Sequence, residues 1–321
     1  MMRFVVRVTV WLVVFLGLAQ SVAFAEADPW AALQKTALAA RALNYQGLFV
    51  YQNGAQLRSV QIIHMNDGTN EFTRNMVMEG ERREVYSQGK DIVILQPKND
   101  KVVMEKRHGQ NLFPAIFPSN LDLIKTSYNA RFGPNEIISG RSAQIINLES
   151  KDSYRYSYKL WTDNENSLLL KMVLLNKDEA VEQVEFNQIN FQHNQQSNMV
   201  QPKIDISKNY VIDNLSNTNH VNGGKWSVAD LPPGYRKIDQ IELKVPGKSA
   251  IVNQLIYSDG LAAVSLFIEP VSKGVRPKVG HTVMGSTNVC ANVIDGYQII
   301  VVGEVPAGAV MQISKAVRFN K

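Results

Sequence analysis

Three successive β-strands are predicted between Tyr154 and Phe191, and this block constrains the fold more than any other stretch. Apolar and polar side chains alternate along 154–160, which is the pattern of a strand with one buried face. The polar run 162–166 then predicts a turn. The next strand, 168–175, is apolar on both faces apart from Lys171, so protein or an apolar ligand must cover both of them.

The third strand of this block contains a change of phase. Val184 and Phe186 point to one face, whereas Ile189 and Phe191 are one residue out of step with them. Such a shift indicates a β-bulge, which bends a sheet. A long, bent antiparallel sheet with uncovered apolar surface is a shape suited to binding lipid.

Hairpin turns recur along the N-terminal part of the chain. Asn-Gly and Asp-Gly pairs between β-forming residues are strong hairpin signals. The predicted turns are Asn53-Gly54, Asp67-Gly68, Glu79-Gly80, Gln88-Gly89 and Pro97–Asp100. A helix that begins at Asp28-Pro29, with Asp28 as its N-cap, precedes them. No helical periodicity long enough for an α/β fold occurs among the turns.

The segment 111–120 (NLFPAIFPSN) interrupts this series of strands. Pro114 and Pro118 exclude a regular strand or helix interior, so the apolar side chains around them lie in a loop. One interpretation is a plug that folds over the core, and the other is the lip of an apolar cavity. A short helix at 121–128, capped by Ser119, and a strand at 140–148 are predicted to follow.

The first 25 residues have the pattern of a secretion signal. Arg3 and Arg7 supply the positive start, an apolar run follows, and Ala23-Phe24-Ala25 predicts cleavage after Ala25. An uncleaved anchor is the alternative. The single cysteine, Cys290, excludes an internal disulfide, so packing must stabilise the exported chain. We expect Cys290 to be a small buried residue, with a reactive thiol as the alternative.

A polar segment at 214–224, rich in Asn, Ser, Thr, His and Gly, predicts a flexible linker between two domains. The second domain, 225–321, is predicted to contain short strands and a final helix that starts at Pro306. These strands are 237–245, 251–257, 261–269, 289–294 and 297–302. The sequence therefore predicts an α+β fold that is mostly β. A large curved antiparallel sheet, or half-open barrel, with helices spans 26–213, and a small antiparallel α+β domain follows it.

Charge and motifs narrow the range of functions. The domain at 225–321 has 11 basic and 7 acidic residues, which suits an acidic protein partner or phosphate-bearing head groups. This excess is too small and dispersed to indicate nucleic acid. The five histidines show no metal-ligand spacing with one another or with Cys290, and no hydrolase, phosphate-loop or dinucleotide motif occurs. We therefore expect no catalytic residues, metal or cofactor, although a hydrolase whose residues meet only in space is an alternative.

Several motifs carry a resemblance to a known family. YQGLFVYQ (45–52), RYSYKLWTD (155–163) and VEQVEFNQI (181–189) resemble the first domain of the RseB/MucB family. YSDGLAAVSLFIE (257–269) and DGYQIIVVGEVP (295–306) resemble its second domain. The resemblance extends over nearly the whole chain after the signal, with the motifs in the same order.

This resemblance implies a periplasmic negative regulator of an envelope-stress sigma factor. Family members bind the periplasmic domain of a membrane-bound anti-sigma factor of the RseA/MucA type and shield it from its site-one protease. Their first domain is similar to the lipoprotein carriers LolA and LolB, a half-open barrel that takes acyl chains. Lipopolysaccharide or misplaced lipid would then trigger release. Self-association into a homo-oligomer is a further option.

The expected binding residues follow from this resemblance together with the strand pattern. Acyl chains are expected among apolar and aromatic residues of the first domain: Phe49, Tyr51, Leu112, Phe113, Ile116, Phe117, Tyr156, Tyr158 and Met172. The anti-sigma factor is expected to contact the second domain at Tyr257, Phe267, Arg276 and Lys278. Ordinary core packing is the alternative for each apolar residue. The alternative function is that of a soluble periplasmic carrier of lipid or lipoprotein.

Overall fold

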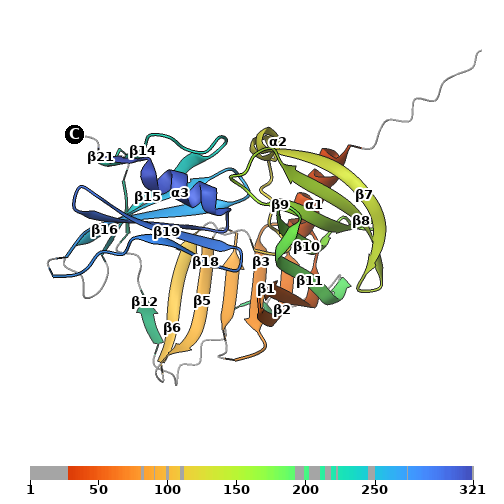
Figure 1. Cartoon of the computed structure of the whole chain (residues 1–321). Coiled ribbons are helices and arrows are strands. Elements are labelled where there is room, and N and C mark those ends of the chain that lie inside the picture. The colour runs from red at the N-terminus through yellow and green to blue at the C-terminus, as the bar shows by residue number, and fades with distance from the viewer. Residues whose placement is uncertain are drawn as a thin grey trace, which may run out of the picture.

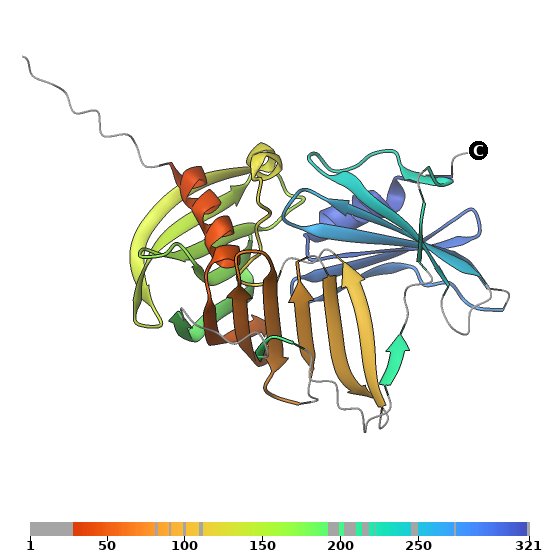
Figure 2. The same cartoon turned by 180° about the vertical axis from the view of Figure 1, so that it is seen from behind.

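The computed structural model describes residues 28–80, 83–89, 91–98, 101–108, 112–191, 199–201, 210–213, 218–221, 223–244, 250–272 and 274–319. Two large β-sheets, each with helical cover, stand side by side in this part of the chain (Figure 1, Figure 2), and a small third sheet has two strands. The signal peptide predicted at 1–25 lies outside the described residues. Among the residues that are described, no helix is both long and apolar enough to cross a membrane.

The first domain is built on a sheet of 12 strands in the order β12-β6-β5-β4-β3-β2-β1-β11-β10-β9-β8-β7. Its elements are α1 (Pro29–Ala42), β1 (Tyr45–Asn53), β2 (Gln56–Asn66), β3 (Glu71–Val77), β4 (Glu84–Gln88), β5 (Asp91–Lys98), β6 (Lys101–His108), α2 (Asp122–Ser127), β7 (Tyr128–Ile138), β8 (Arg141–Ser150), β9 (Ser157–Asp163), β10 (Leu169–Asn176), β11 (Glu179–Phe191) and β12 (Tyr210–Asp213). The sheet curves without joining its first strand to its last (Figure 1), which confirms the predicted half-open architecture.

The local signals in the sequence place most of these strands correctly. Each predicted hairpin turn connects two paired strands, from β1 and β2 at Asn53-Gly54 to β5 and β6 after Pro97. The predicted bulge is also present. Leu48 on β1 pairs with Gln188, but Phe49 pairs with Phe186, so Asn187 is the extra residue on β11. This extra residue accounts for the change of phase that the sequence shows.

Helix α1 begins at the predicted position and packs on this sheet. Asp28 is the N-cap, with its Oδ1 accepting a hydrogen bond from the Trp30 amide at 2.9 Å. Leu33, Ala37 and Ala40 are buried in the core of the first domain. Helix α2 is correctly predicted, but its cap is not. Asn120 Oδ1, rather than Ser119, accepts from the amide of Asp122.

Two predictions are wrong, one about where a strand begins and one about the linker. The first strand of the 154–191 block begins at Ser157, because residues 151–155 form bends whose Arg155 side chain turns towards the second domain. The segment predicted as a linker contains β13 (Thr218–His220), which pairs with the second sheet. Strands β7 and β12 were not predicted. Strand β12 pairs with β6 in parallel, and a parallel pair leaves no hairpin signal in the sequence.

The second domain has a sheet of seven strands in the order β13-β15-β16-β17-β20-β19-β18. Its other elements are β14 (Trp226–Val228), β15 (Arg236–Lys244), β16 (Ile251–Ser258), β17 (Ala263–Pro270), β18 (Gly280–Met284), β19 (Thr287–Ile294), β20 (Tyr297–Gly303), α3 (Ala307–Lys315) and β21 (Val317–Phe319). The five predicted strands and the final helix are present, whereas β13, β14, β18 and β21 were missed. Val310 and Ile313 of α3 are buried in a second core, which is separate from that of the first domain.

Candidate lipid cavity between the two domains

A buried ion pair joins the two domains. Arg155 of the first domain and Asp259 of the second lie 2.8 Å apart, and neither side chain is exposed to solvent. Tyr235 adds a bond across the same contact, because its hydroxyl donates to the backbone oxygen of Tyr154 at 3.1 Å. Leu261 also packs against the core of the first domain. The domains therefore form a tight junction at this point.

A second junction is made by the turn between β18 and β19. The Ser286 hydroxyl donates to the buried carboxylate of Glu182, and the Ser286 amide donates to Asn53 Oδ1 at 3.1 Å. Gly285, at φ +57°, allows this approach, because a Cβ there would overlap the Asn53 amide. The Tyr156 hydroxyl donates to the backbone oxygen of Ser286 at 3.0 Å. The turn is thus held to strands β1 and β11 of the first domain and to the residue that precedes β9.

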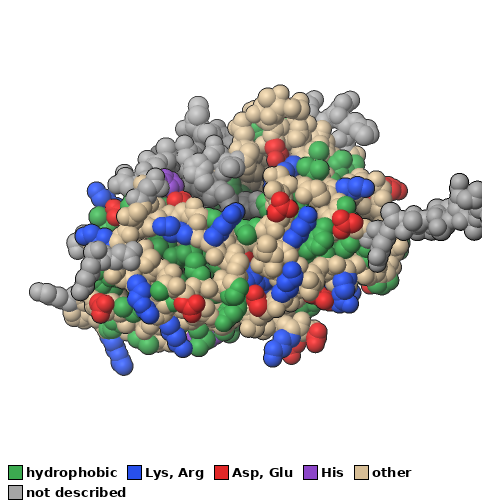
Figure 3. Space-filling view, turned by 90° about the horizontal axis from the view of Figure 1, so that it is seen from above, with side chains coloured by type: hydrophobic (Ala, Val, Ile, Leu, Met, Phe, Trp, Pro, Cys, Tyr) green, Lys and Arg blue, Asp and Glu red, His purple; other side chains and the backbone are tan. Residues whose placement is uncertain are grey.

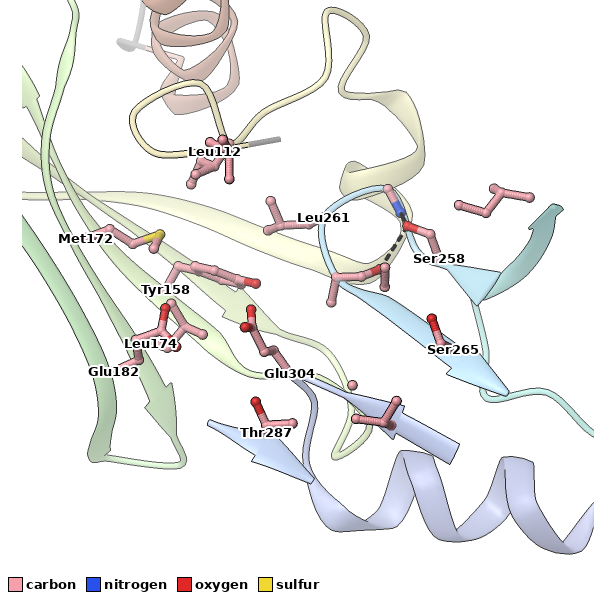
Figure 4. A pocket seen from close by; sticks show the side chains of 17 residues that line it. Leu112, Tyr158, Met172, Leu174, Glu182, Ser258, Leu261, Ser265, Thr287 and Glu304 are labelled. Atoms are coloured by element: carbon pink, nitrogen blue, oxygen red, sulfur yellow. Dashed lines mark hydrogen bonds between the residues drawn. The ribbon is translucent and has the colours of Figure 1, made fainter. Parts of the chain in front are cut away.

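A cavity of about 480 Å³ lies between these junctions, with walls from both domains (Figure 4). Its apolar wall includes Leu112, Ile116, Met172, Leu174 and Leu261. Two carboxylates, Glu182 of the first domain and Glu304 of the second, lie on its polar side. The cavity can therefore take an apolar chain with a polar end, which is the chemistry of a lipid.

The loop from Leu112 to Asn120 separates this cavity from a second one. The chain crosses from β6, near one end of the first sheet, to β7 at the other end, so this connection has to pass over the sheet. A cavity of about 490 Å³ lies on the other side of the loop, between it and residues such as Tyr45, Ile62 and Thr73. Leu112 lines both cavities.

The loop combines the two interpretations that its sequence allows. Phe113 is a plug, because its ring lies 5.1 Å from those of Phe49 and Phe186 in the core. Phe117 is also buried, and its backbone oxygen accepts from Arg41 at 3.1 Å. By contrast, the half-buried side chains of Leu112 and Ile116 form part of the cavity lip.

The structure brings together only part of the predicted lipid-binding set. Leu112, Ile116, Tyr158 and Met172 line the cavity between the domains, and Phe113 lines the second cavity. The other members line neither cavity: Phe49, Tyr51, Phe117 and Tyr156. Phe49 and Phe117 belong to the core, and the hydroxyl groups of Tyr51 and Tyr156 bond to Glu182 and Ser286.

The residues predicted to contact a protein partner fall in different surroundings. Tyr257 is 2% exposed and lies in the core of the second domain, which accounts for it without a partner. Phe267 is half-buried on β17. Arg276 and Lys278 are exposed on the segment that leads into β18. Their role in binding stays a prediction.

Sequence reasoning missed the two carboxylates in the cavity and the Arg155–Asp259 pair. Glu182 lies on β11 and is only 7% exposed. Burial raises the pKa of Glu182, and hydrogen bonds from Ser286 and Tyr51 oppose that rise. Glu304 keeps contact with solvent, yet the protein around it and the charge of Glu182 raise its pKa to about 7. No local signal marks these residues, because the groups that surround them come from the other domain.

These pKa shifts predict that the intact protein is less stable at pH 8 than at pH 5.5. The folded chain holds its carboxyl protons more tightly than the unfolded chain, so this contribution is lost as the pH rises through about 7. Glu304→Gln should flatten the dependence of the melting temperature on pH over this range. Glu242→Gln, on β15 away from the cavity, is the matched control. An unchanged pH profile for Glu304→Gln would contradict the assignment.

The double role of the loop predicts that truncating Phe113 mainly lowers stability, whereas truncating Leu112 mainly weakens ligand binding. Phe113→Ala should lower the free energy of unfolding by about 3–5 kcal/mol, because it leaves a cavity among packed rings. Leu112→Ala should lower it by only about 1 kcal/mol but should weaken binding of an acyl probe. Urea denaturation and probe titration measure the two quantities. Equal losses of stability would refute the division into plug and lip.

Other sites are not indicated by the described residues. Within them, no group of three or more His, Cys, Asp or Glu side chains is arranged to hold a metal ion. Cys290 is half-buried and unbridged. On the face seen in Figure 3, basic and acidic side chains are interspersed rather than gathered into one basic surface.

Comparison with known proteins decides the family. The family model of the MucB/RseB N-terminal domain matches residues 28–204, and that of the MucB/RseB C-terminal domain matches residues 221–318. This chain belongs to the MucB/RseB family. Both of its domains therefore have counterparts in other MucB/RseB proteins, in the same order.

Members of the MucB/RseB family are named as regulators of sigma factors. The chain is 28% identical to sigma factor AlgU regulatory protein MucB of Pseudomonas aeruginosa in an alignment of 314 residues that covers 92% of this chain and 91% of that protein. It is 25% identical to sigma-E factor regulatory protein RseB of Escherichia coli in an alignment of 302 residues that covers 90% of each chain. The solved Pseudomonas aeruginosa MucA/MucB complex contains a chain with the same fold, at a TM-score of 0.74 and 24% identity, covering 92% of this chain and 100% of that one.

Proposed function

We propose that this MucB/RseB protein is a periplasmic negative regulator of an envelope-stress sigma factor of the sigma-E type. It binds the periplasmic domain of a membrane-bound anti-sigma factor and shields that domain from site-one proteolysis. Family membership supports this proposal, as do solved structures of a relative, MucB, with the periplasmic part of MucA. The predicted signal, cleaved after Ala25, would deliver the chain to the periplasm, and the N-terminal sequence of the exported protein tests that step.

The single observation that carries the sensing step is a cavity whose walls come from both domains. A lipid acyl chain, from lipopolysaccharide or another source, would lie between Leu112, Met172 and Leu261. Each CH₂ group of the acyl chain that becomes buried contributes about 0.8 kcal/mol to binding, so burial of four of them contributes about 3 kcal/mol. Because a ligand shifts an equilibrium only by its differential affinity, lipid must favour a domain arrangement that the anti-sigma factor does not.

Protease protection tests the proposal directly. The purified chain is mixed with the periplasmic domain of the anti-sigma factor and its site-one protease, with and without added lipopolysaccharide. We expect slow cleavage when the chain is present and fast cleavage once lipopolysaccharide is added. Equal cleavage with and without the chain would overturn the regulatory function. Protection that lipopolysaccharide leaves intact would overturn the sensing step alone. Sedimentation of the same sample tests whether the chain forms a homo-oligomer.

A soluble carrier of lipid or lipoprotein is the second candidate, and the same cavity favours it. A carrier would copurify with an acyl ligand and transfer it between vesicles. It would have no effect on proteolysis of the anti-sigma factor, so the two candidates are distinguished by one pair of assays.

A further inference from the structure

Strand β18 is an unusually open edge of the second sheet. It is the last strand in the order, so one of its sides pairs with β19 and the other has no neighbouring strand among the described residues. All five of its residues are exposed, so neither of its faces is covered. An edge of this kind presents unpaired N–H and C=O groups to any extended chain.

Apolar side chains are concentrated around this edge. Val279 is 72% exposed, Val283 57% and Met284 68%. Folded proteins commonly protect exposed edges with charges or proline inside the strand, yet β18 has neither. Val283 and Met284 are neighbours on the strand and point to opposite faces, so the strand exposes an apolar side chain on each face beside its open edge. The edge therefore fits a partner that covers its apolar residues and pairs with its backbone.

The charge around β18 indicates the chemistry of that partner. From Pro270 to Ile294 the chain contains Lys273, Arg276 and Lys278 and no acidic residue. Arg276 and Lys278 are exposed directly before the strand. A partner segment that alternates acidic and apolar residues would match both features, because opposite charges steer association and discriminate against other partners.

The position of β18 links this edge to the cavity. Met284 at the end of β18 pairs with Thr287, which lines the cavity between the domains. The intervening turn is the one that Ser286 holds to Asn53 and Glu182. A change in the contents of the cavity can therefore move the strand that would carry the partner.

We infer that β18 is a docking edge, onto which an extended, acidic segment of the anti-sigma factor's periplasmic domain adds as a further β-strand. This inference rests on the proposed function and assigns a surface to it. Main-chain hydrogen bonds along the edge supply affinity, and the exposed apolar side chains supply specificity for alternate residues of the segment. Arg276 and Lys278 bind the acidic residues that flank it.

Binding of the full chain to the anti-sigma factor's periplasmic domain, measured by titration calorimetry, tests the inference with three variants. Val283→Lys places a new charge among the apolar residues of the edge, where a lysine opposes strand pairing, and should weaken binding at least about tenfold. The double variant Arg276→Glu, Lys278→Glu should also weaken binding and reduce its dependence on salt. Ile137→Lys is the matched control, because Ile137 is 68% exposed on β7, the edge strand of the other sheet. It should bind within about twofold of the parent.

Hydrogen exchange separates strand addition from a simple surface contact. Backbone amides of β18 should exchange more slowly once the partner is bound, and those of β7 should not change. If Val283→Lys failed to fold, Met284→Lys would take its place. Parent-like affinity of the edge variants, or unchanged exchange in β18, overturns the docking edge and leaves the proposed function standing. Absence of binding by the parent overturns both.

Discussion

Replacement of Arg155 by alanine is expected to lower the free energy of unfolding by about 3–5 kcal/mol, because it leaves Asp259 as a buried charge without its partner. Both side chains are fully buried in the parent, and Arg155 also bonds to Asp152 and to the backbone oxygen of Pro233. The two domains have separate cores, and this pair joins them. Calorimetry should therefore show two unfolding transitions in the variant where the parent shows one.

An exposed ion pair in the same protein provides the control. Arg131 and Glu149 pair on the surface of the first domain, with their side chains 65% and 43% exposed. Arg131→Ala should change the free energy of unfolding by about 0–1 kcal/mol, because water compensates an exposed charge. If Arg155→Ala unfolded in a single transition with the stability of Arg131→Ala, the pair would not join the domains.

Replacement of Ala263 by tryptophan should abolish most acyl binding without unfolding the protein. Ala263 is exposed at the start of β17 and lines the cavity between the domains, so a larger side chain there occupies space for ligand. Loss of contact with two CH₂ groups already costs about 1.6 kcal/mol, which is roughly tenfold in affinity. Titration with a fluorescent fatty acid measures this loss. The variant should also keep shielding the anti-sigma factor when lipopolysaccharide is present.

Ala229→Trp is the matched control for this substitution. Ala229 is exposed next to β14 and lines neither cavity. It should bind the fatty acid as the parent does. Parent-like affinity in Ala263→Trp would show that acyl chains bind elsewhere, with the second cavity beneath the 112–120 loop as the next place to probe.

Most of the fold can be predicted from the sequence, because the signals for its turns, strands and bulge are local. The hairpin at Asn53-Gly54 needs a residue with positive φ, and Gly54 supplies it at +57°. The bulge between Phe186 and Gln188 is visible as a shift in the alternation of apolar residues. Such features depend on a few neighbouring residues, so the order of residues alone determines them.

The candidate site is readable only in part. The prolines at 114 and 118 place the apolar side chains around them in a loop, but the sequence leaves open whether this loop is a plug or a lip. In the structure Leu112 and Ile116 line the cavity. Phe49 and Tyr156 were assigned to lipid on their apolar character, yet one packs in the core and the other bonds to Ser286. The apolar character of a side chain does not show whether it packs in the core or lines a cavity. The outcome depends on whether other side chains fill the space that it faces.

The sequence by itself determined the curved antiparallel sheet, its hairpins and bulge, and the small second domain, since periodicity and turn chemistry act over a few residues. Only the tertiary structure decided that Arg155 meets Asp259, that Glu182 is enclosed beside Ser286, and that the cavity lies between the domains. Each of these contacts joins residues about a hundred positions apart. At that distance no local sequence pattern predicts which residue is the partner. A polar residue on a strand, which the local pattern assigns to the solvent-exposed face, is buried when a second domain covers it.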